Sequence, residues 1–308
     1  MLPLHYGAVL VNLLLLVSES TQSPLFKRSA PAASGCGIAP NTKKHQSFQS
    51  NGGLRHFLVD LPKSYDQNKP SAMIISYHGH GSSNENQESI DQFKTDAFNS
   101  DLQAIVVYPN GLPGTDGESA WEGAVYAQPG VSDVSFTADL LNYMRSGYCI
   151  DNSRIYAAGK SNGGGFVDVL ACSSVGAEFA AFGMSNAALY NEVLGPACKP
   201  GRVPSPVIEL HGAADTLIDY IGGGSHDVAL PSIPDWLKTW ASRNGCSTTP
   251  TVTKTNGLTH TTYDCNGKIN VEGYLVDGMA HTWPDAGNND SGFQGTKAIV
   301  DFFKAHTK

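Results

Sequence analysis

The sequence predicts an α/β fold in which a mostly parallel central sheet carries helices on both faces. Three observations predict it: short apolar, β-branched runs alternate with amphipathic segments, no repeat divides residues 29–308, and 41% of the chain is hydrophobic against 16% charged. Strands that are buried on both faces of a parallel sheet read as continuous apolar runs. A chain of 308 residues with this composition can bury one large core, so a single domain is expected.

The expected strands and helices alternate along the chain. An alternating pattern predicts a half-exposed strand at residues 55–61, and continuous apolar runs predict buried strands after it. These buried strands are residues 72–77, 104–108, 155–158, 180–184, 207–210 and 271–276. Helical periodicity predicts helices at residues 134–145, 166–171, 233–242 and 295–305, the last of which closes the domain. Asp133 is expected to cap the first helix.

The N-terminal residues predict export. Residues 8–17 form an apolar run that is too short to cross a bilayer, and small and polar residues follow it, as in a signal peptide. The alternative for this run is a buried strand or helix. Lys27-Arg28 is typical of a dibasic processing site. We therefore expect a secreted, extracellular protein with a signal peptide at 1–20, a pro-segment at 21–28 and the folded domain at 29–308.

Cysteine content and charge agree with that destination. The six cysteines are an even number without the spacing of a zinc site, so disulfides are expected. Their pairing stays open, with Cys246–Cys265 the most local choice and Cys172–Cys198 the next. The net charge of −8 offers no electrostatic footprint for nucleic acid. Asn289 begins a glycosylation sequon, which predicts a surface loop there.

Ser161 is the expected nucleophile. The strand at 155–158 runs into Gly159-Lys160-Ser161-Asn162-Gly163, and an apolar helical segment follows. In a strand-to-helix turn, this G-x-S-x-G pattern holds the serine oxygen above the carboxyl end of the sheet, at a helix N-terminus that favours an oxyanion. The alternative is a glycine-rich turn with an incidental serine, and the flanking strand and helix favour the nucleophile.

Two later loops supply the expected base and acid, because on such a sheet the chain order is Ser, then Asp or Glu, then His. Asp215 lies in a loop directly after a strand and is the expected acid, with Asp219 as its rival. His281 lies between the last expected strand and the last helix and is the expected base. His211 is expected to pack against the Asp215 loop or to bond it.

The segment His78-Gly79-His80-Gly81 follows the strand at 72–77 and predicts an oxyanion hole. The expected donors are the backbone N–H groups of His80 and Asn162. A metal site at His78 and His80 is the alternative. No carboxylate or third histidine stands at a useful spacing, so no metal is expected.

With these segments in place, the chain resembles the fungal secreted feruloyl esterases of the type C/D group. Those enzymes are related to polyhydroxybutyrate-depolymerase-like esterases and carbohydrate esterase family 1, within the α/β-hydrolase superfamily. The resemblance covers nearly all of residues 35–308. The matching segments include Gly35-Cys36-Gly37, Tyr108-Pro109-Asn110-Gly111, Tyr148-Cys149-Ile150-Asp151, the Ser161 turn, Arg243-Asn244-Gly245-Cys246 and His281-Thr282-Trp283-Pro284.

The resemblance implies a Ser161–Asp215–His281 triad that hydrolyses ferulate esters on plant cell-wall polysaccharides such as arabinoxylan, without a metal or organic cofactor. The implied partner is the feruloylated polysaccharide, with neither nucleic acid nor membrane, and a monomer is expected. A polyhydroxybutyrate depolymerase or an acetylxylan esterase would use the same machinery. A non-catalytic wall-binding protein is the third alternative.

A flat phenolic acyl group would suit a slot with aromatic walls. The aromatic residues expected near the sheet-end loops are Trp121, Tyr126, Tyr220 and Trp283. The alternative for each of them is a place in the core or at the rim.

Overall fold

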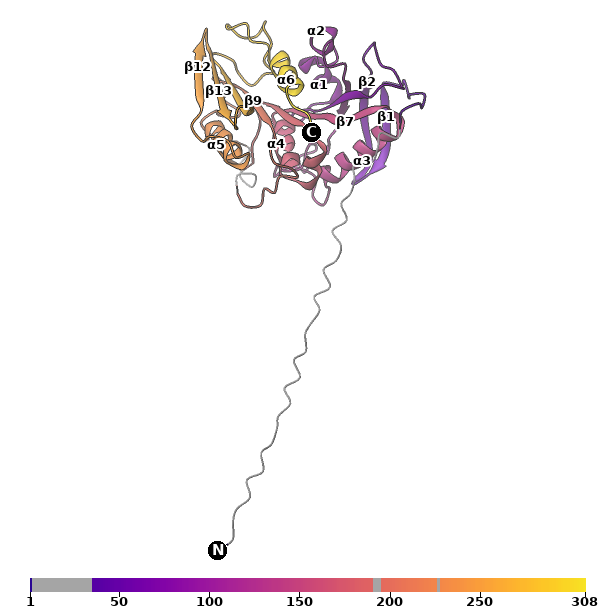
Figure 1. Ribbon diagram of the computed structural model, residues 1–308, viewed down its shortest axis with the longest axis horizontal. Coiled ribbons are helices and arrows are strands. Elements are labelled where there is room, and N and C mark those ends of the chain that lie inside the picture. Colours follow the sequence, from indigo (N-terminus) through magenta and orange to yellow (C-terminus); the bar gives the residue numbers. More distant parts are fainter. Residues whose placement is uncertain (2–34, 191–194, 226–227) are drawn as a thin grey trace. The chain divides into compact units, whose positions relative to one another are not determined.

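The computed structural model describes Met1 and residues 35–190, 195–225 and 228–308. Its main strands are β1 (His45–Ser50), β2 (Gly53–Asp60), β3 (Ser71–Tyr77), β4 (Ile105–Pro109), β7 (Ile150–Lys160), β8 (Ala181–Ser185), β9 (Val207–Gly212), β12 (Thr251–Thr255), β13 (Leu258–Asp264) and β14 (Ile269–Val276). They form one sheet in the order β1-β2-β4-β3-β7-β8-β9-β14-β13-β12 (Figure 1). The strands from β4 to β14 in this order are parallel, and antiparallel strands extend both edges.

Helices cover both faces of this sheet. In the described residues they are α1 (Asn84–Asp91), α2 (Asp96–Asn99), α3 (Asp133–Gly147), α4 (Asn162–Ala171), α5 (Ile233–Arg243) and α6 (Gly295–Lys304), with a 3-10 turn at Ser174–Glu178. One buried cluster joins α3, α4 and α5 to one face of the sheet, and another joins α6 and the end of α1 to the other. In Figure 1, α1, α2 and α6 lie on the opposite side of the strands from α3, α4 and α5. This is the predicted mostly parallel sheet with helices on both faces.

Every strand and helix expected from the sequence overlaps an observed one, and the misses lie at the margins. The edge strands β1 and β12 and the strand β13 next to β12 were not predicted, and neither were α1 and α2. Two small hairpins were also missed, β5 (Leu112–Pro113) with β6 (Ser119–Ala120) and β10 (Gly223–Ser225) with β11 (Val228–Leu230). Strands of two or three residues leave no periodic pattern to recognise.

The predicted cap of α3 is wrong by one residue. The cap is Ser132, whose Oγ accepts a hydrogen bond from Ser135 N at 3.2 Å. Asp133 instead forms an ion pair at 2.7 Å with Arg55, whose side chain is fully buried in β2. A buried guanidinium needs a charged partner, and Asp133 provides it from the first residue of the helix, while Ser132 before it makes the cap.

Three disulfides lie in the described residues. Cys246–Cys265 and Cys172–Cys198 are the two pairs that the sequence favoured, and Cys36–Cys149 is the third. The Asn289 amide donates to Asp285 O and Phe293 O, so its sequon lies in a loop that the asparagine itself holds together. None of the described helices has both the length and the apolar character needed to cross a bilayer. The predicted signal peptide and pro-segment fall outside the described residues, apart from Met1.

Candidate active site

Ser161 lies at the junction of β7 and α4, in the turn that the sequence predicted. Its backbone has φ 55° and ψ −123°, a conformation that residues other than glycine rarely adopt. A hydrogen bond from Ser161 N to Ser185 O, at 3.0 Å, ties the turn to β8. Such backbone strain is typical of positions where function requires the geometry.

Glycines let three backbone segments converge on this turn. A Cβ at Gly163 would lie 2.3 Å from Tyr77 O, and one at Gly159 would lie 2.5 Å from the carbonyl of Gly163. A Cβ at Gly79 would lie 3.2 Å from Ser161 Cβ, so the loop after β3 passes directly beside the serine. Side chains at these glycines would push the loop and the serine apart.

Asp215 and His281 meet at the end of the sheet where Ser161 lies. His281 Nδ1 is 2.6 Å from Asp215 Oδ2, although the two residues are 66 positions apart in the chain. The other carboxylate oxygen accepts backbone N–H bonds from Leu217 and Ile218, both at 2.9 Å. The rival acid, Asp219, is exposed and bonds the N–H of Ile221 in its own loop. The structure therefore brings Asp215, and not Asp219, to the histidine.

His211 holds the far side of Asp215. Its Nδ1 is 2.9 Å from Glu209 Oε1, and its Nε2 is 2.8 Å from Ile218 O and 3.7 Å from Asp215 Oδ2. Both ring nitrogens face oxygens, and an imidazole can donate from both only when it is protonated, so these contacts favour the imidazolium. Burial opposes this charge, but Glu209, the Ile218 carbonyl and Asp215 outweigh it and raise the pKa of His211. The expected role of His211, to bond the Asp215 loop, is confirmed.

The pKa of His281 is shifted in the opposite direction to that of His211. Burial lowers the pKa of His281, and the charges of Lys160 and His211 lower it further, against the hydrogen bond and charge of Asp215. Burial would raise the pKa of Asp215, but bonds from His281 and Ile218 and the charges of both histidines bring it below its usual range. The Nε2 atom of His281 has no hydrogen-bond partner among the described residues. A neutral imidazole with an unused nitrogen is suited to accept a proton.

The loop after β3 is fixed by the histidine at its start. His78 is fully buried, and its Nε2 accepts the N–H of Gly111 at 3.0 Å, so its proton is on Nδ1, 2.7 Å from Gly79 O. Burial lowers the pKa of His78 to about 4, which keeps it neutral. The His80 ring instead pairs with Asp116 at 2.9 Å. The described residues contain no group of three or more His, Cys, Asp or Glu placed to hold a metal ion.

Asn162, the other expected oxyanion donor, is the first residue of α4. Its buried side chain accepts a bond from Trp121 N at 2.8 Å and donates to the Tyr190 hydroxyl at 2.6 Å. These bonds fix the orientation of the peptide that follows Ser161. N–H groups in the first turn of a helix have no partner within the helix, so they can bind an anion.

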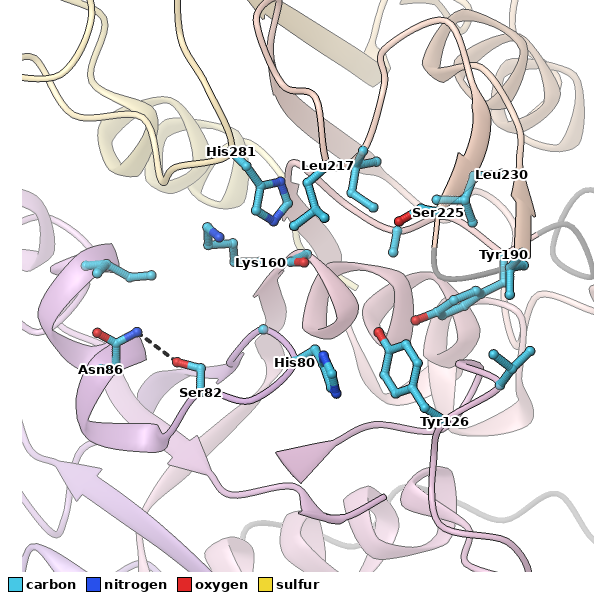
Figure 2. A pocket seen from close by; sticks show the side chains of 17 residues that line it. His80, Ser82, Asn86, Tyr126, Lys160, Tyr190, Leu217, Ser225, Leu230 and His281 are labelled. Atoms are coloured by element: carbon cyan, nitrogen blue, oxygen red, sulfur yellow. Dashed lines mark hydrogen bonds between the residues drawn. The ribbon is translucent and has the colours of Figure 1, made fainter. Parts of the chain in front are cut away.

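A cavity of about 240 Å³ opens beside these groups, and both Ser161 and His281 line it. Figure 2 shows His281, Leu217 and Lys160 together at one end and the hydroxyls of Tyr126 and Tyr190 turned toward each other at the opposite end. The Tyr126 ring also packs on His80, with ring centroids 4.1 Å apart. The other lining residues are mostly aliphatic or small, namely Gly79, Ser82, Asn86, Ile90, Val125, Ala188, Ile218, Ser225, Val228 and Leu230.

Of the four aromatic residues expected to line an acyl slot, only Tyr126 lines the cavity. Trp121 is fully buried and donates its indole N–H to His78 O, and Trp283 is buried and donates to Thr296 Oγ1. Both indoles have found internal partners, so they pack in the core, and their predicted place in the slot is wrong. Tyr220 packs against His211 and does not line the cavity. Tyr190, which was not predicted from the sequence, is the other tyrosine that lines the cavity.

This fold and this arrangement of serine, histidine and aspartate define a serine hydrolase with the α/β-hydrolase fold. Residues 89–191 match the model of the prolyl oligopeptidase family. An acetyl xylan esterase from Aspergillus awamori superposes with a TM-score of 0.61 at 15% identity, covering 85% of this chain and 100% of that one. A ferulic acid esterase from Anaeromyces mucronatus, in complex with ferulic acid, gives 0.50 at 16% identity, covering 87% and 93%. At such identities these likenesses show the fold alone.

Sequence relatives give the family. Feruloyl esterase D of Neurospora crassa is 30% identical over 222 residues, which are 68% of this chain and 70% of that enzyme. Feruloyl esterase B of Piromyces equi is 30% identical over 237 residues, 75% of this chain, and this chain spans 43% of its length. The chain therefore belongs to the feruloyl esterase family and is a serine carboxylic-ester hydrolase.

Proposed function

We propose that this protein hydrolyses hydroxycinnamate esters, ferulate above all, on plant cell-wall polysaccharides such as arabinoxylan. The observation that carries the proposal is the cavity itself, in which Ser161 and His281 lie beside a wall built from Tyr126, Tyr190 and Leu230. A flat phenolic acyl group fits an aromatic and aliphatic wall, and the paired tyrosine hydroxyls offer polar contacts to its ring substituents.

The proposed reaction is acyl transfer in two halves. Ser161 Oγ attacks the ester carbonyl while His281 Nε2 takes its proton, and Asp215 stabilises the imidazolium that forms. The backbone N–H groups of His80 and Asn162 bind the oxyanion. The alcohol leaves with the proton from His281, and water, activated by the same nitrogen, then releases the acid and restores Ser161.

The proposal places the enzyme outside the cell. A signal peptide at residues 1–20 and a pro-segment at 21–28 would direct the domain to the oxidising space in which three disulfides form. There the enzyme would act as a monomer on feruloylated polysaccharide.

Three substrates assayed side by side test the proposal: methyl ferulate, acetylated xylan and polyhydroxybutyrate. We expect the wild type to cleave methyl ferulate, and Ser161→Ala to lose at least about 10⁴-fold in kcat. Full activity in Ser161→Ala would refute the mechanism. Cleavage of only acetylated xylan or only polyhydroxybutyrate would refute the substrate while leaving the mechanism intact.

Tyr190→Leu sharpens the assignment of the acyl wall, because it removes the hydroxyl and keeps an apolar side chain. We expect KM for methyl ferulate to rise about tenfold, with a much smaller change for a short acetyl ester that does not reach this wall. Equal losses on both esters would mean that Tyr190 acts only through its bond to Asn162.

A further inference from the structure

The proposed reaction leaves one charged group in the cavity without a role. Lys160, the residue before the nucleophile, lines the cavity, and no Asp or Glu is among the described residues that do so. The whole chain has 28 acidic residues against 20 Lys and Arg, so a cavity with a lysine and no acid departs from its overall charge. A lining with an ammonium and no carboxylate can attract an anion although the net charge of the chain is negative.

Lys160 combines partial burial with the lack of a partner, whereas the other described lysines either form an ion pair or are exposed. Lys44 and Lys94 both pair with Glu88, and Lys297 pairs with Asp301. The ammonium of Lys160 makes no hydrogen bond or ion pair with any part of the chain that the structure describes. It is nevertheless partly buried, and that burial lowers its pKa while the charge of Asp215 opposes the shift.

A partly buried ammonium that has lost some of its water without gaining a partner costs free energy. The charge of Asp215 compensates only in part, because the carboxylate bonds His281 and two backbone N–H groups and makes no hydrogen bond to Lys160. A ligand that brings a negative charge into the cavity would supply the missing partner.

The two sides of the cavity differ in chemistry. Figure 2 shows Lys160 on the same side as Asn86 and Ser82, whose side chains are joined by a hydrogen bond of 2.8 Å, while Tyr126, Tyr190 and Leu230 occupy the other side. The first side carries an ammonium, an amide and a hydroxyl, and the second is aromatic and aliphatic. Sugars and anions suit the first side, and a phenolic ring suits the second.

The reaction geometry assigns these sides to the two halves of an ester. The leaving alcohol must receive its proton from His281 Nε2, so the alcohol oxygen lies next to that imidazole. Lys160 is near enough to His281 for its charge to lower the pKa of the imidazole. With the acyl group against the tyrosines, the alcohol extends past His281 toward Lys160.

We propose that Lys160 binds a carboxylate on the alcohol half of the ester, so that the preferred substrates are hydroxycinnamate esters of acidic glycans, in which a uronate lies at or next to the esterified sugar. This inference rests on the proposed function, which it deepens by naming the charge of the leaving group. Lysine suits this task because it acts as a mobile point charge and tolerates a carboxylate in several positions.

Two esters that differ only in that charge test the inference. One is 5-O-caffeoylquinate, whose alcohol carries a carboxylate, and the other is its methyl ester, which is neutral; release of caffeate is measured for both. We expect wild type to prefer the acid by about fivefold in kcat/KM, the scale of one partly exposed charge pair. Lys160→Met should bring this ratio close to one, and Lys160→Arg should keep it. Added salt should lower the wild-type ratio as the pair is screened.

The ratio of kcat/KM for the two esters distinguishes failure of this inference from failure of the proposed function. Lys297→Met removes an exposed lysine of α6 and should leave the ratio unchanged. A wild-type ratio near one that neither salt nor Lys160→Met changes would overturn the inference while cleavage of both esters upheld the proposed function. Release of caffeate from neither ester, nor of ferulate from methyl ferulate, would overturn the proposed function and this inference with it. If Lys160→Met fails to fold, two measurements still test whether Lys160 binds the carboxylate: the salt dependence of the wild-type ratio and the ratio of Lys160→Arg.

Discussion

Two histidines lie against the same carboxylate oxygen of Asp215, His211 at 3.7 Å on the core side and His281 at 2.6 Å on the cavity side. His211 is fully buried, both of its nitrogens face acceptors, and its pKa is raised. His281 keeps one nitrogen unbonded and its pKa is lowered. The surroundings of the two histidines thus favour the protonated imidazole on the core side of Asp215 and the neutral, proton-accepting imidazole on the cavity side.

This difference teaches that the surroundings of Asp215, and not its presence alone, assign the catalytic role. A histidine that is already protonated cannot take a proton from serine, whereas its charge can stabilise the carboxylate. His211 on the core side therefore stabilises the Asp215 carboxylate, and His281 on the cavity side is the histidine that this carboxylate assists as a base.

The largest expected effect comes from exchanging each histidine for glutamine. His281→Gln should lower kcat on methyl ferulate by at least about 10⁴-fold and leave the denaturant midpoint close to that of wild type. His211→Gln should cost about 3–5 kcal/mol of stability, because it leaves Glu209 buried without a charged partner. Chemical denaturation and steady-state kinetics on both variants check this. A large stability loss in His281→Gln, or none in His211→Gln, would contradict the comparison.

The two aspartates of the loop after β9 give the next largest effect. Asp215→Asn should lower kcat by about 10³–10⁴-fold, since the amide cannot stabilise the His281 imidazolium. Asp219→Asn is the matched control in the same loop and should stay within about twofold of wild type, because Asp219 bonds only its own turn. Similar losses in both variants would mean that the loop, and not the carboxylate, had been damaged.

The framework of this site was predictable from the sequence, and its walls were not. Ser161 directly follows β7, and Asp215 and His281 lie in the loops after β9 and β14, so strand order alone placed them at one edge. Tyr190 and Leu230 come from loop segments after β8 and in the β10–β11 hairpin, where no periodicity indicates which side chains face the cavity. Whether an aromatic in such a loop packs inward or lines the cavity depends on partners such as His78 O, to which Trp121 donates.

The raised pKa of His211 also could not be predicted from the sequence. Glu209 and His211 are two residues apart in a strand, which places both side chains on one face of the sheet. Nothing in that spacing shows that the Ile218 carbonyl closes the other nitrogen, because the loop must fold back to bring it within 2.8 Å. That contact is one of the causes, after the charge and hydrogen bond of Glu209, that raise the pKa of His211.

A smaller effect is expected from the charge on the core side. Glu209→Gln removes the strongest support for the raised pKa of His211, so it should cost about 1–3 kcal/mol at pH 6. A histidine whose pKa is raised by folding stabilises the folded state fully at pH values below its unfolded pKa of about 6.5. This stabilisation is lost as pH rises through the folded pKa. The difference between wild type and variant should therefore shrink at higher pH. Denaturation from pH 5.5 to 9 checks this, with Glu272→Gln, which removes the partner of His260, as control. A difference that grew with pH would contradict it.

The smallest expected effect is a shift in the pH profile from the cavity side. Since the lowered pKa of His281 keeps it neutral, the acid limb of kcat/KM on methyl ferulate should lie below the ordinary histidine value of about 6.5. Besides burial, the groups that set this pKa are Asp215, which raises it, and Lys160 and His211, which lower it. Lys160→Met removes one of the two cations, so the acid limb should move to higher pH, while Lys297→Met should leave it in place. Profiles on this neutral ester isolate the effect from substrate charge, and a shift to lower pH would show that Lys160 does not act on His281 through its charge.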